Sequence, residues 1–275
     1  MVMSVLVLAA CSDPGTAGEP EPPTREFPNW PSLFDGLRFR WTAEPGIDLL
    51  TGPGVPLRAF VESFRIGAST YDPDSDSPPP KFQTYPGFHN AVAHPPGGPS
   101  SSPHQIRYAW PIHGSAYNLE PLFGNEYLHV LQLDSIENGY RAYVCDGRYN
   151  VFRHDTEADK YVSIVNAYTT INLWRVELTH TPPLPPPGPP QEGPNPAPLD
   201  DQFGKWGIAA TDDASWGWED RPNPPDDAPD QWVLYRECFD KMPVPEPDMQ
   251  ATVRLRLDAP PDFEPAVPGW PADPN

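Results

Sequence analysis

The pattern of apolar positions predicts one clear helix near the start of the folded region. After Pro56, which is tolerated in a first helical turn, apolar residues recur at positions i, i+3, i+4 and i+7, and the pattern ends at Gly67. The polar residues Arg58, Glu62 and Arg65 are expected on the opposite face. A second apolar stretch, residues 85–92, is expected to form another short helix. The stripe of the first helix consists of Leu57, Phe60, Val61 and Phe64.

The middle of the chain has the alternation and composition of β-strands. Residues 127–133 form an apolar, β-prone run, and the Asn138-Gly139 pair after it is typical of a two-residue hairpin turn. Residues 140–145 are therefore expected to return antiparallel to the first run. Further strands are expected at residues 149–152, 161–165, 170–178, 231–239 and 249–257.

Short helices followed by a series of antiparallel strands predict an α+β fold. One or two short helices are expected to pack on a curved, mostly antiparallel sheet, within a single domain of residues 29–258. This arrangement is similar to the cone of NTF2-like proteins. The likeness concerns the fold and implies no function.

Several segments break the regular pattern. Residues 29–47 are aromatic and are expected to form an irregular lead-in to the core. Ten of the seventeen residues 182–198 are Pro, so the insertion 181–198 is expected to be polyproline II or irregular. Residues 199–230 are acidic and rich in Trp, and residues 259–275 are expected to form a loose tail.

Composition narrows the class of protein. The chain has 43 Pro and 20 Gly among its 275 residues, which disfavours long helices, while 9 Trp, 11 Tyr and 12 Phe indicate a packed core. The formal net charge of −20 would repel a phosphate backbone, so no nucleic-acid partner is expected. The chain has no Walker-type or dinucleotide-binding glycine pattern, and no cofactor is predicted.

The N-terminus has the pattern of an exported protein. An apolar run ends in Leu8-Ala9-Ala10-Cys11, which resembles the bacterial lipobox, whose cysteine is lipidated after cleavage. Residues 1–10 are therefore interpreted as a signal peptide, and residues 11–28 as a flexible tether. The run lacks the preceding Lys or Arg of an ordinary signal peptide. The pattern implies an extracytoplasmic protein that the lipid on Cys11 anchors to the outer face of the cell membrane.

A second resemblance points to the same compartment. Residues 41–59, WTAEPGIDLLTGPGVPLRA, resemble a stretch of uncharacterised exported proteins from actinobacteria of the mycobacterial type. The resemblance implies an envelope protein and carries no activity, ligand or site residue.

The two remaining cysteines are expected to pair. In an oxidising compartment Cys145 and Cys238 would form one disulfide, which ties the later segments to the central sheet. The alternative interpretation is two buried free thiols.

The acidic, Trp-rich segment contains the candidate ligand-binding residues. Planar aromatic rings beside carboxylates can stack on sugars, and two carboxylates can serve glycoside hydrolysis. The alternative is that the tryptophans pack on the core while the acidic side chains face water. The candidate residues are Trp206, Trp216, Trp218, Asp212 and Asp213.

Two further patterns of acidic and histidine residues do not meet the requirements of a metal site. Asp72, Asp74 and Asp76 have the spacing of an EF-hand start, but Ser77 and Gln83 stand where that loop needs Gly and Glu. Four histidines are spaced too loosely to predict a zinc or copper site. No metal is therefore predicted. The four are His89, His94, His104 and His113.

These observations predict a lipid-anchored envelope protein that binds a small molecule or an envelope protein, with no catalytic residue assigned. The alternative function is an envelope polysaccharide-binding protein or hydrolase that uses residues 206–220. These two functions differ in whether the Trp-rich segment offers its rings to a ligand.

Overall fold

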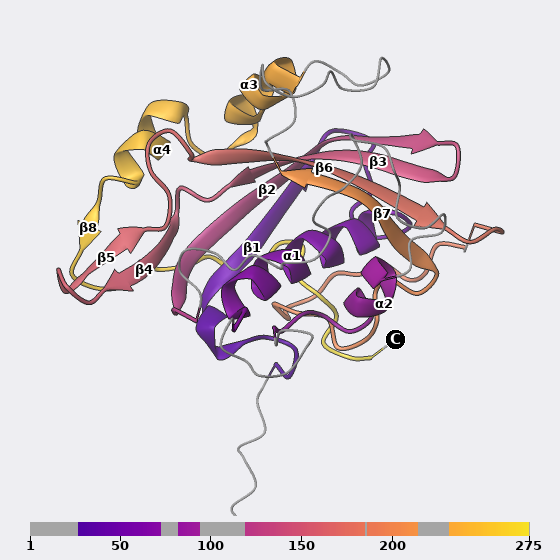
Figure 1. Ribbon diagram of the computed structural model, residues 1–275, viewed down its shortest axis with the longest axis horizontal. Coiled ribbons are helices and arrows are strands. Elements are labelled where there is room, and N and C mark those ends of the chain that lie inside the picture. Colours follow the sequence, from indigo (N-terminus) through magenta and orange to yellow (C-terminus); the bar gives the residue numbers. More distant parts are fainter. Residues whose placement is uncertain (1–26, 73–81, 94–118, 185, 214–230, 275) are drawn as a thin grey trace, which may run out of the picture.

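The computed structural model describes residues 27–72, 82–93, 119–184, 186–213 and 231–274. These residues form an α+β fold, in which an open, mostly antiparallel sheet carries short helices on both faces (Figure 1). Helix α1 crosses one face of the sheet, and helices α3 and α4 lie on the other. The predicted fold class is confirmed.

The sheet has eight strands. Seven follow the order β7-β6-β3-β2-β4-β5-β8, and β1 pairs with β2 outside this path. The strands are β1 (Gly36–Ala43), β2 (Leu122–Ile136), β3 (Gly139–Gly147), β4 (Val151–Asp155), β5 (Lys160–Ser163), β6 (Ile171–His180), β7 (Trp206–Asp213) and β8 (Arg256–Leu257).

Strand β2 is the axis of the sheet. Strand β1 pairs with residues 123–130 of β2 in parallel, whereas β3 and β4 pair with β2 antiparallel. Since β1 overlaps the β2 residues that pair with both β3 and β4, these two strands share the opposite edge of β2. The hairpin predicted at Asn138-Gly139 is present, and it connects β2 to β3.

The helices are η1 (Ser32–Phe34, a 3-10 turn), α1 (Gly54–Thr70), α2 (Phe88–Ala93), α3 (Gln231–Lys241) and α4 (Glu246–Thr252). The predicted helices near residues 56–67 and 85–92 correspond to α1 and α2. The strand predicted at 231–239 is wrong, because this segment is helix α3. The strand predicted at 249–257 is also wrong, apart from the two residues of β8.

Two hydrophobic cores lie on the two faces of the sheet. In β3, Ala142 and Val144 face the core beneath α1, while Tyr143 and Cys145 face the core beneath α3 and α4. Because successive side chains in a strand point to opposite faces, a strand covered on both sides is apolar throughout. The same alternation in β6 places Trp174 in the first core and Leu173 in the second.

Three segments predicted to be irregular or loose take part in the fold. The lead-in 29–47 contains β1, and the Trp-rich segment 199–230 contains the whole of β7. The predicted loose tail is wrong for residue 270, since the Trp270 side chain is 1% exposed and lies in the core. The Pro-rich insertion is irregular as predicted, apart from isolated pairing of Asn195 with Trp270.

Helix α1 is buried on its polar side as well as its apolar side. Arg58 and Glu62, predicted on the outer face, are 0% and 2% exposed. Arg65 is also engaged, with Nε 3.0 Å from Glu126 Oε1 and an ion pair to the buried Asp146. The segments that cover α1 are the Pro-rich insertion and residues 268–270. Their position against α1 could not be predicted from sequence patterns.

The Glu62 carboxylate is the centre of a buried hydrogen-bond cluster. Oε1 accepts a hydrogen bond from Trp41 Nε1 at 2.7 Å. Oε2 accepts one from the Tyr85 hydroxyl at 2.8 Å and one from Trp270 Nε1 at 2.9 Å. Burial raises the pKa of Glu62, and the nearby Arg58 guanidinium and these three hydrogen bonds offset only part of that shift.

This raised pKa gives a testable pH dependence. In the unfolded chain Glu62 ionises near its ordinary pKa of 4.5, whereas in the fold it holds its proton to a higher pH. Its contribution to stability is therefore complete below pH 4.5 and declines as the pH rises through the folded pKa. We expect the advantage of the wild type over Glu62→Gln, measured by urea unfolding, to shrink over this range. A constant advantage from acid to neutral pH would contradict the raised pKa.

Candidate functional site

A pocket of about 270 Å³ lies where the C-terminal end of α3 meets strands β1 and β2. The two strands form its floor, and Met242 and Pro243, just after α3, form an apolar wall. Residues 264–267 close a further side, held to β1 by an ion pair of 3.0 Å between Arg40 and Glu264. The pocket therefore joins four segments that are separated in sequence.

The parallel register of β1 and β2 brings the polar floor residues together. Thr42 is the register partner of His129, and Arg40, two residues earlier, is the partner of Tyr127. Because positions i and i+2 of a strand share a face, all four side chains lie on the α3 face of the sheet. Trp41 and Leu128, between them, belong to the core on the opposite face.

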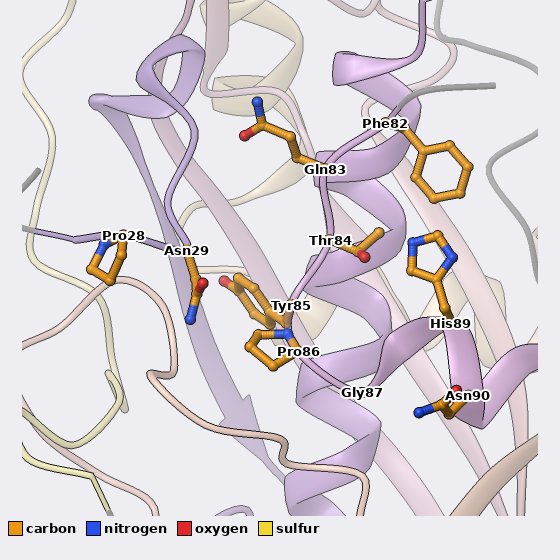
Figure 2. A pocket seen from close by; sticks show the side chains of 10 residues that line it. All are labelled: Pro28, Asn29, Phe82, Gln83, Thr84, Tyr85, Pro86, Gly87, His89 and Asn90. Carbon is orange, nitrogen blue, oxygen red and sulfur yellow. The ribbon is translucent and has the colours of Figure 1, made fainter. Parts of the chain in front are cut away.

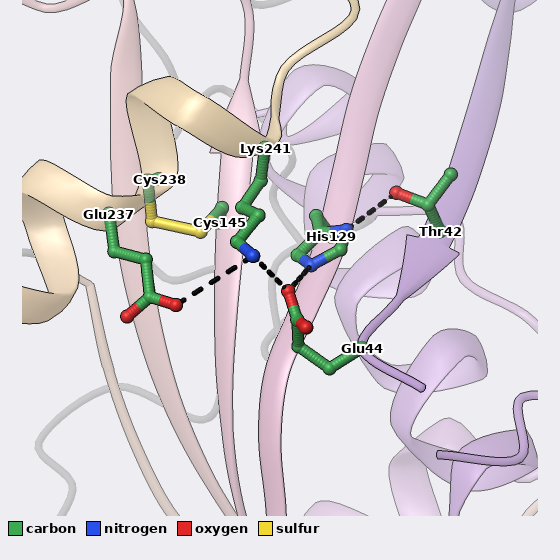
Figure 3. Close-up of a disulfide and its surroundings, with 7 residues drawn as sticks. All are labelled: Thr42, Glu44, His129, Cys145, Glu237, Cys238 and Lys241. Atoms are coloured by element: carbon green, nitrogen blue, oxygen red, sulfur yellow. Dashed lines mark hydrogen bonds and ion pairs between the residues drawn. A yellow bond between two sulfur atoms is a disulfide. The ribbon is translucent and has the colours of Figure 1, made fainter. Parts of the chain in front are cut away.

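A chain of polar contacts runs through His129 (Figure 3). The Thr42 hydroxyl oxygen lies 2.7 Å from His129 Nδ1, and His129 Nε2 lies 3.0 Å from Glu44 Oε1. The same carboxylate oxygen pairs with the Lys241 ammonium of α3, which also lies 3.8 Å from Glu237. Thr42 is exposed, while the His129 side chain is 9% exposed.

The charges of this chain determine which atom donates each hydrogen bond. Hydrogen bonds from Lys241 and His129 lower the pKa of Glu44, so its carboxylate is ionised and can only accept. His129 Nε2 must then carry the proton that it donates to Glu44. Burial lowers the pKa of His129 despite the attraction of Glu44, so the ring is neutral at pH 7 and Nδ1 has a free lone pair. The Thr42 hydroxyl therefore donates to Nδ1.

This arrangement can act as a base beside a hydroxyl group. A carboxylate orients the imidazole, and the imidazole accepts a proton from an exposed hydroxyl, as in the nucleophile, base and orienting group of covalent catalysis. Sequence reasoning missed this site because it predicted residues 29–47 to be irregular. The signal that could have found it is the β-compatible run Phe39–Thr42, which contains alternating apolar residues.

A second pocket, of about 580 Å³, lies beside α2 (Figure 2). Its ten lining residues, from Pro28-Asn29 and the 82–90 segment, include no carboxylate and no ammonium. Asn29 donates to the backbone carbonyls of Pro198 and Leu199, and the Tyr85 hydroxyl donates to the buried Glu62. Two of the side chains that could orient a ligand there thus already form hydrogen bonds within the protein. The α3 pocket is therefore the stronger candidate for a ligand-binding site.

The cysteine pairing predicted from the sequence is confirmed. Cys145 of β3 and Cys238 of α3 form a disulfide with a Cα–Cα distance of 5.4 Å. It lies on the same face of the sheet as the α3 pocket (Figure 3). The predicted lipidation site, Cys11, lies outside the described residues.

The predicted sugar-binding residues are only partly described. Trp206 is 8% exposed, and its ring packs against His180 at 5.2 Å and Tyr140 at 5.9 Å between centroids. Its faces are therefore used by the core. Asp212 and Asp213 belong to β7, where they pair in register with Arg175 and Trp174. Trp216 and Trp218 lie outside the described residues.

The part of the chain that the structure describes contains no group of three or more His, Cys, Asp or Glu side chains that could hold a metal ion. Of the patterns considered above, Asp72 and His89 are described, whereas Asp74, Asp76, His94, His104 and His113 are not. No described helix has both the length and the apolar character needed to cross a bilayer.

Comparison with known proteins gives no match: neither a family model, nor a curated protein, nor a solved structure is similar to this chain.

Proposed function

We propose that this protein is exported, anchored to the outer face of the cell membrane through a lipid on Cys11, and binds a small envelope ligand in the α3 pocket. The observation that supports export is the disulfide between Cys145 and Cys238. Disulfides persist in oxidising compartments and are rare in the cytosol. The lipobox-like residues Leu8–Cys11 point to the same compartment independently.

The α3 pocket supports a binding role by its chemistry. Its apolar wall lies beside a hydroxyl, an imidazole and an ammonium group, a combination of apolar surface and a few converging polar groups that is typical of small-molecule sites. A volume of about 270 Å³ is at the small end for such sites and favours a ligand of a few heavy atoms rather than a polymer.

The anchor is tested by the intact mass of the protein extracted from its native membrane without reducing agent. We expect a chain that starts at Cys11, carries a lipid-sized mass increment, and has lost two hydrogens to the disulfide. A Cys11→Ser variant serves as the control and should be recovered without the lipid. An unlipidated chain that retains residues 1–10 and has free thiols would refute the proposal.

A further inference from the structure

We propose that the α3 pocket is an acyl-transfer site, in which the Thr42 hydroxyl takes the acyl group of a small carboxylic ester. The inference rests on the α3 pocket being the ligand site proposed above, and it adds the class of ligand and a reaction. It does not depend on the anchor at Cys11.

Geometry provides the first argument. Thr42 lines the pocket, and its hydroxyl oxygen, the reacting atom, lies 2.7 Å from His129 Nδ1. The base itself is fixed from behind, because His129 Nε2 lies 3.0 Å from Glu44 and Glu44 is held by Lys241. The base is thus within hydrogen-bond reach of a nucleophile on one side and of an orienting carboxylate on the other. Glu44 and Lys241 act here as positioning residues.

The surroundings provide the second argument. Acyl transfer passes through a tetrahedral intermediate whose carbonyl oxygen becomes negative, and nearby positive charge stabilises it. The pocket contains the ammonium of Lys241 and the guanidinium of Arg40, although each already has an acidic partner, Glu44 and Glu264. Met242 and Pro243 offer apolar surface to an acyl chain. A short-chain ester therefore suits both the volume and the lining.

The reaction balances without any cofactor. The Thr42 oxygen bonds to the ester carbonyl carbon as its proton moves to His129 Nδ1. The carbon–oxygen bond to the alcohol then breaks, and the alcohol leaves with that proton. Water attacks the acyl-threonine with its proton passing to His129, and the Thr42 oxygen takes the proton back as the carboxylic acid departs. One ester and one water give one acid and one alcohol.

The test uses the full-length chain and para-nitrophenyl acetate and butyrate. Acid-quenched samples are measured by intact mass and peptide mapping, and nitrophenolate release is followed by absorbance. We expect an acyl increment on Thr42 and a loss of at least about 100-fold in release for Thr42→Val and for His129→Gln. Thr42→Ser should retain labelling. The matched control Thr169→Val changes an exposed threonine that does not line the pocket and should behave as the wild type.

The variants remain interpretable because Thr42 is exposed, and valine is well tolerated in a strand. A label on Lys241 or elsewhere, or unchanged release by Thr42→Val, would overturn acyl transfer. A methyl ketone that mimics the ester but cannot be cleaved separates the two proposals. If it raises the melting temperature while Thr42 is never acylated, acyl transfer fails and the ligand site stands. If it produces neither effect, both fail.

Discussion

Replacing Arg58 by Met is expected to lower the free energy of unfolding by about 3–5 kcal/mol, since removing one member of a buried charge cluster leaves the others uncompensated. Arg58 donates to the carbonyls of Gln191 at 2.9 Å, Pro268 at 2.6 Å and Gly269 at 3.0 Å. A fourth bond, of 3.2 Å, reaches the carbonyl of Leu49. Methionine conserves much of the apolar stem but donates nothing to these four acceptors.

Two further losses accompany the change. The guanidinium lies 4.1 Å from the centre of the Trp270 ring, a cation–π contact that methionine cannot replace. The Glu62 carboxylate also loses the positive charge of Arg58, whose attraction lowers the pKa of Glu62. Burial lowers the pKa of Arg58 to about 10, which still leaves it charged at neutral pH. The full electrostatic effect is therefore expected under ordinary conditions.

Urea unfolding followed by tryptophan fluorescence measures this effect. Arg254→Met is the matched control, because Arg254 is exposed and its replacement should change stability by no more than about 0.5 kcal/mol. Equal stabilities of the two variants would show that the Arg58 contacts contribute nothing net to the fold.

Removal of the disulfide by the double change Cys145→Ala and Cys238→Ala is expected to cost about 4–5 kcal/mol. The bond closes a loop with a sequence separation of 93, and in the chain-entropy model a loop of this length restricts the unfolded chain by that amount. It also holds α3 against the second core, where Leu234 and Met242 are buried at spacings of four residues from Cys238.

Denaturant titrations with and without reductant test this prediction. The wild type should lose stability when reductant is present during unfolding, and the double variant should be unaffected by it. Both sulfur-bearing side chains are 0% exposed, so reductant without denaturant should act slowly on the native protein. Equal stability of the wild type and the double variant would contradict a structural role for the bond.

The sequence predicted correctly those elements that are marked by one apolar helix face or by a turn motif. The stripe from Leu57 to Phe64 identified α1, and Asn138-Gly139 identified the β2–β3 hairpin, because both signals are local. The pairing of Cys145 with Cys238 was predicted from the number of cysteines and from an expected oxidising compartment. None of these predictions depends on which other segments of the chain pack against the element.

Helix α3 was not predicted, because the β-prone composition of the segment was given more weight than the spacing of its apolar residues. Trp232, Val233, Leu234 and Tyr235 form a β-prone run, which predicts a strand. The buried positions are nevertheless Leu234, Cys238 and Met242, four residues apart, while Trp232 and Val233 are 57% and 61% exposed. Packing of this segment on one face of the sheet determines its helical conformation. Local propensities carry no information about that tertiary contact.

The candidate site was missed for a related reason. Thr42 and His129 are 87 residues apart and meet only because β1 inserts parallel to β2. A parallel pair requires a crossover connection, and no local turn signal marks it. The burial of Arg58 could not be predicted from the sequence either. Prolines in the insertion lack N–H groups, so carbonyls there need donors from elsewhere, and Arg58 supplies one to Gln191.

The distance in sequence between α1 and its last partners constrains when the protein can fold. Arg58 and Glu62 bond to Pro268 and Trp270, which follow them by 210 and 208 residues. During synthesis from the N-terminus, the residues of α1 emerge long before these partners exist. If the helix packed earlier, Arg58 and Glu62 would be buried with part of their hydrogen-bond partners missing, and the desolvation of these charges would be less fully offset. Native closure around α1 is therefore a late event, because it must wait until residues 268–270 have been synthesised.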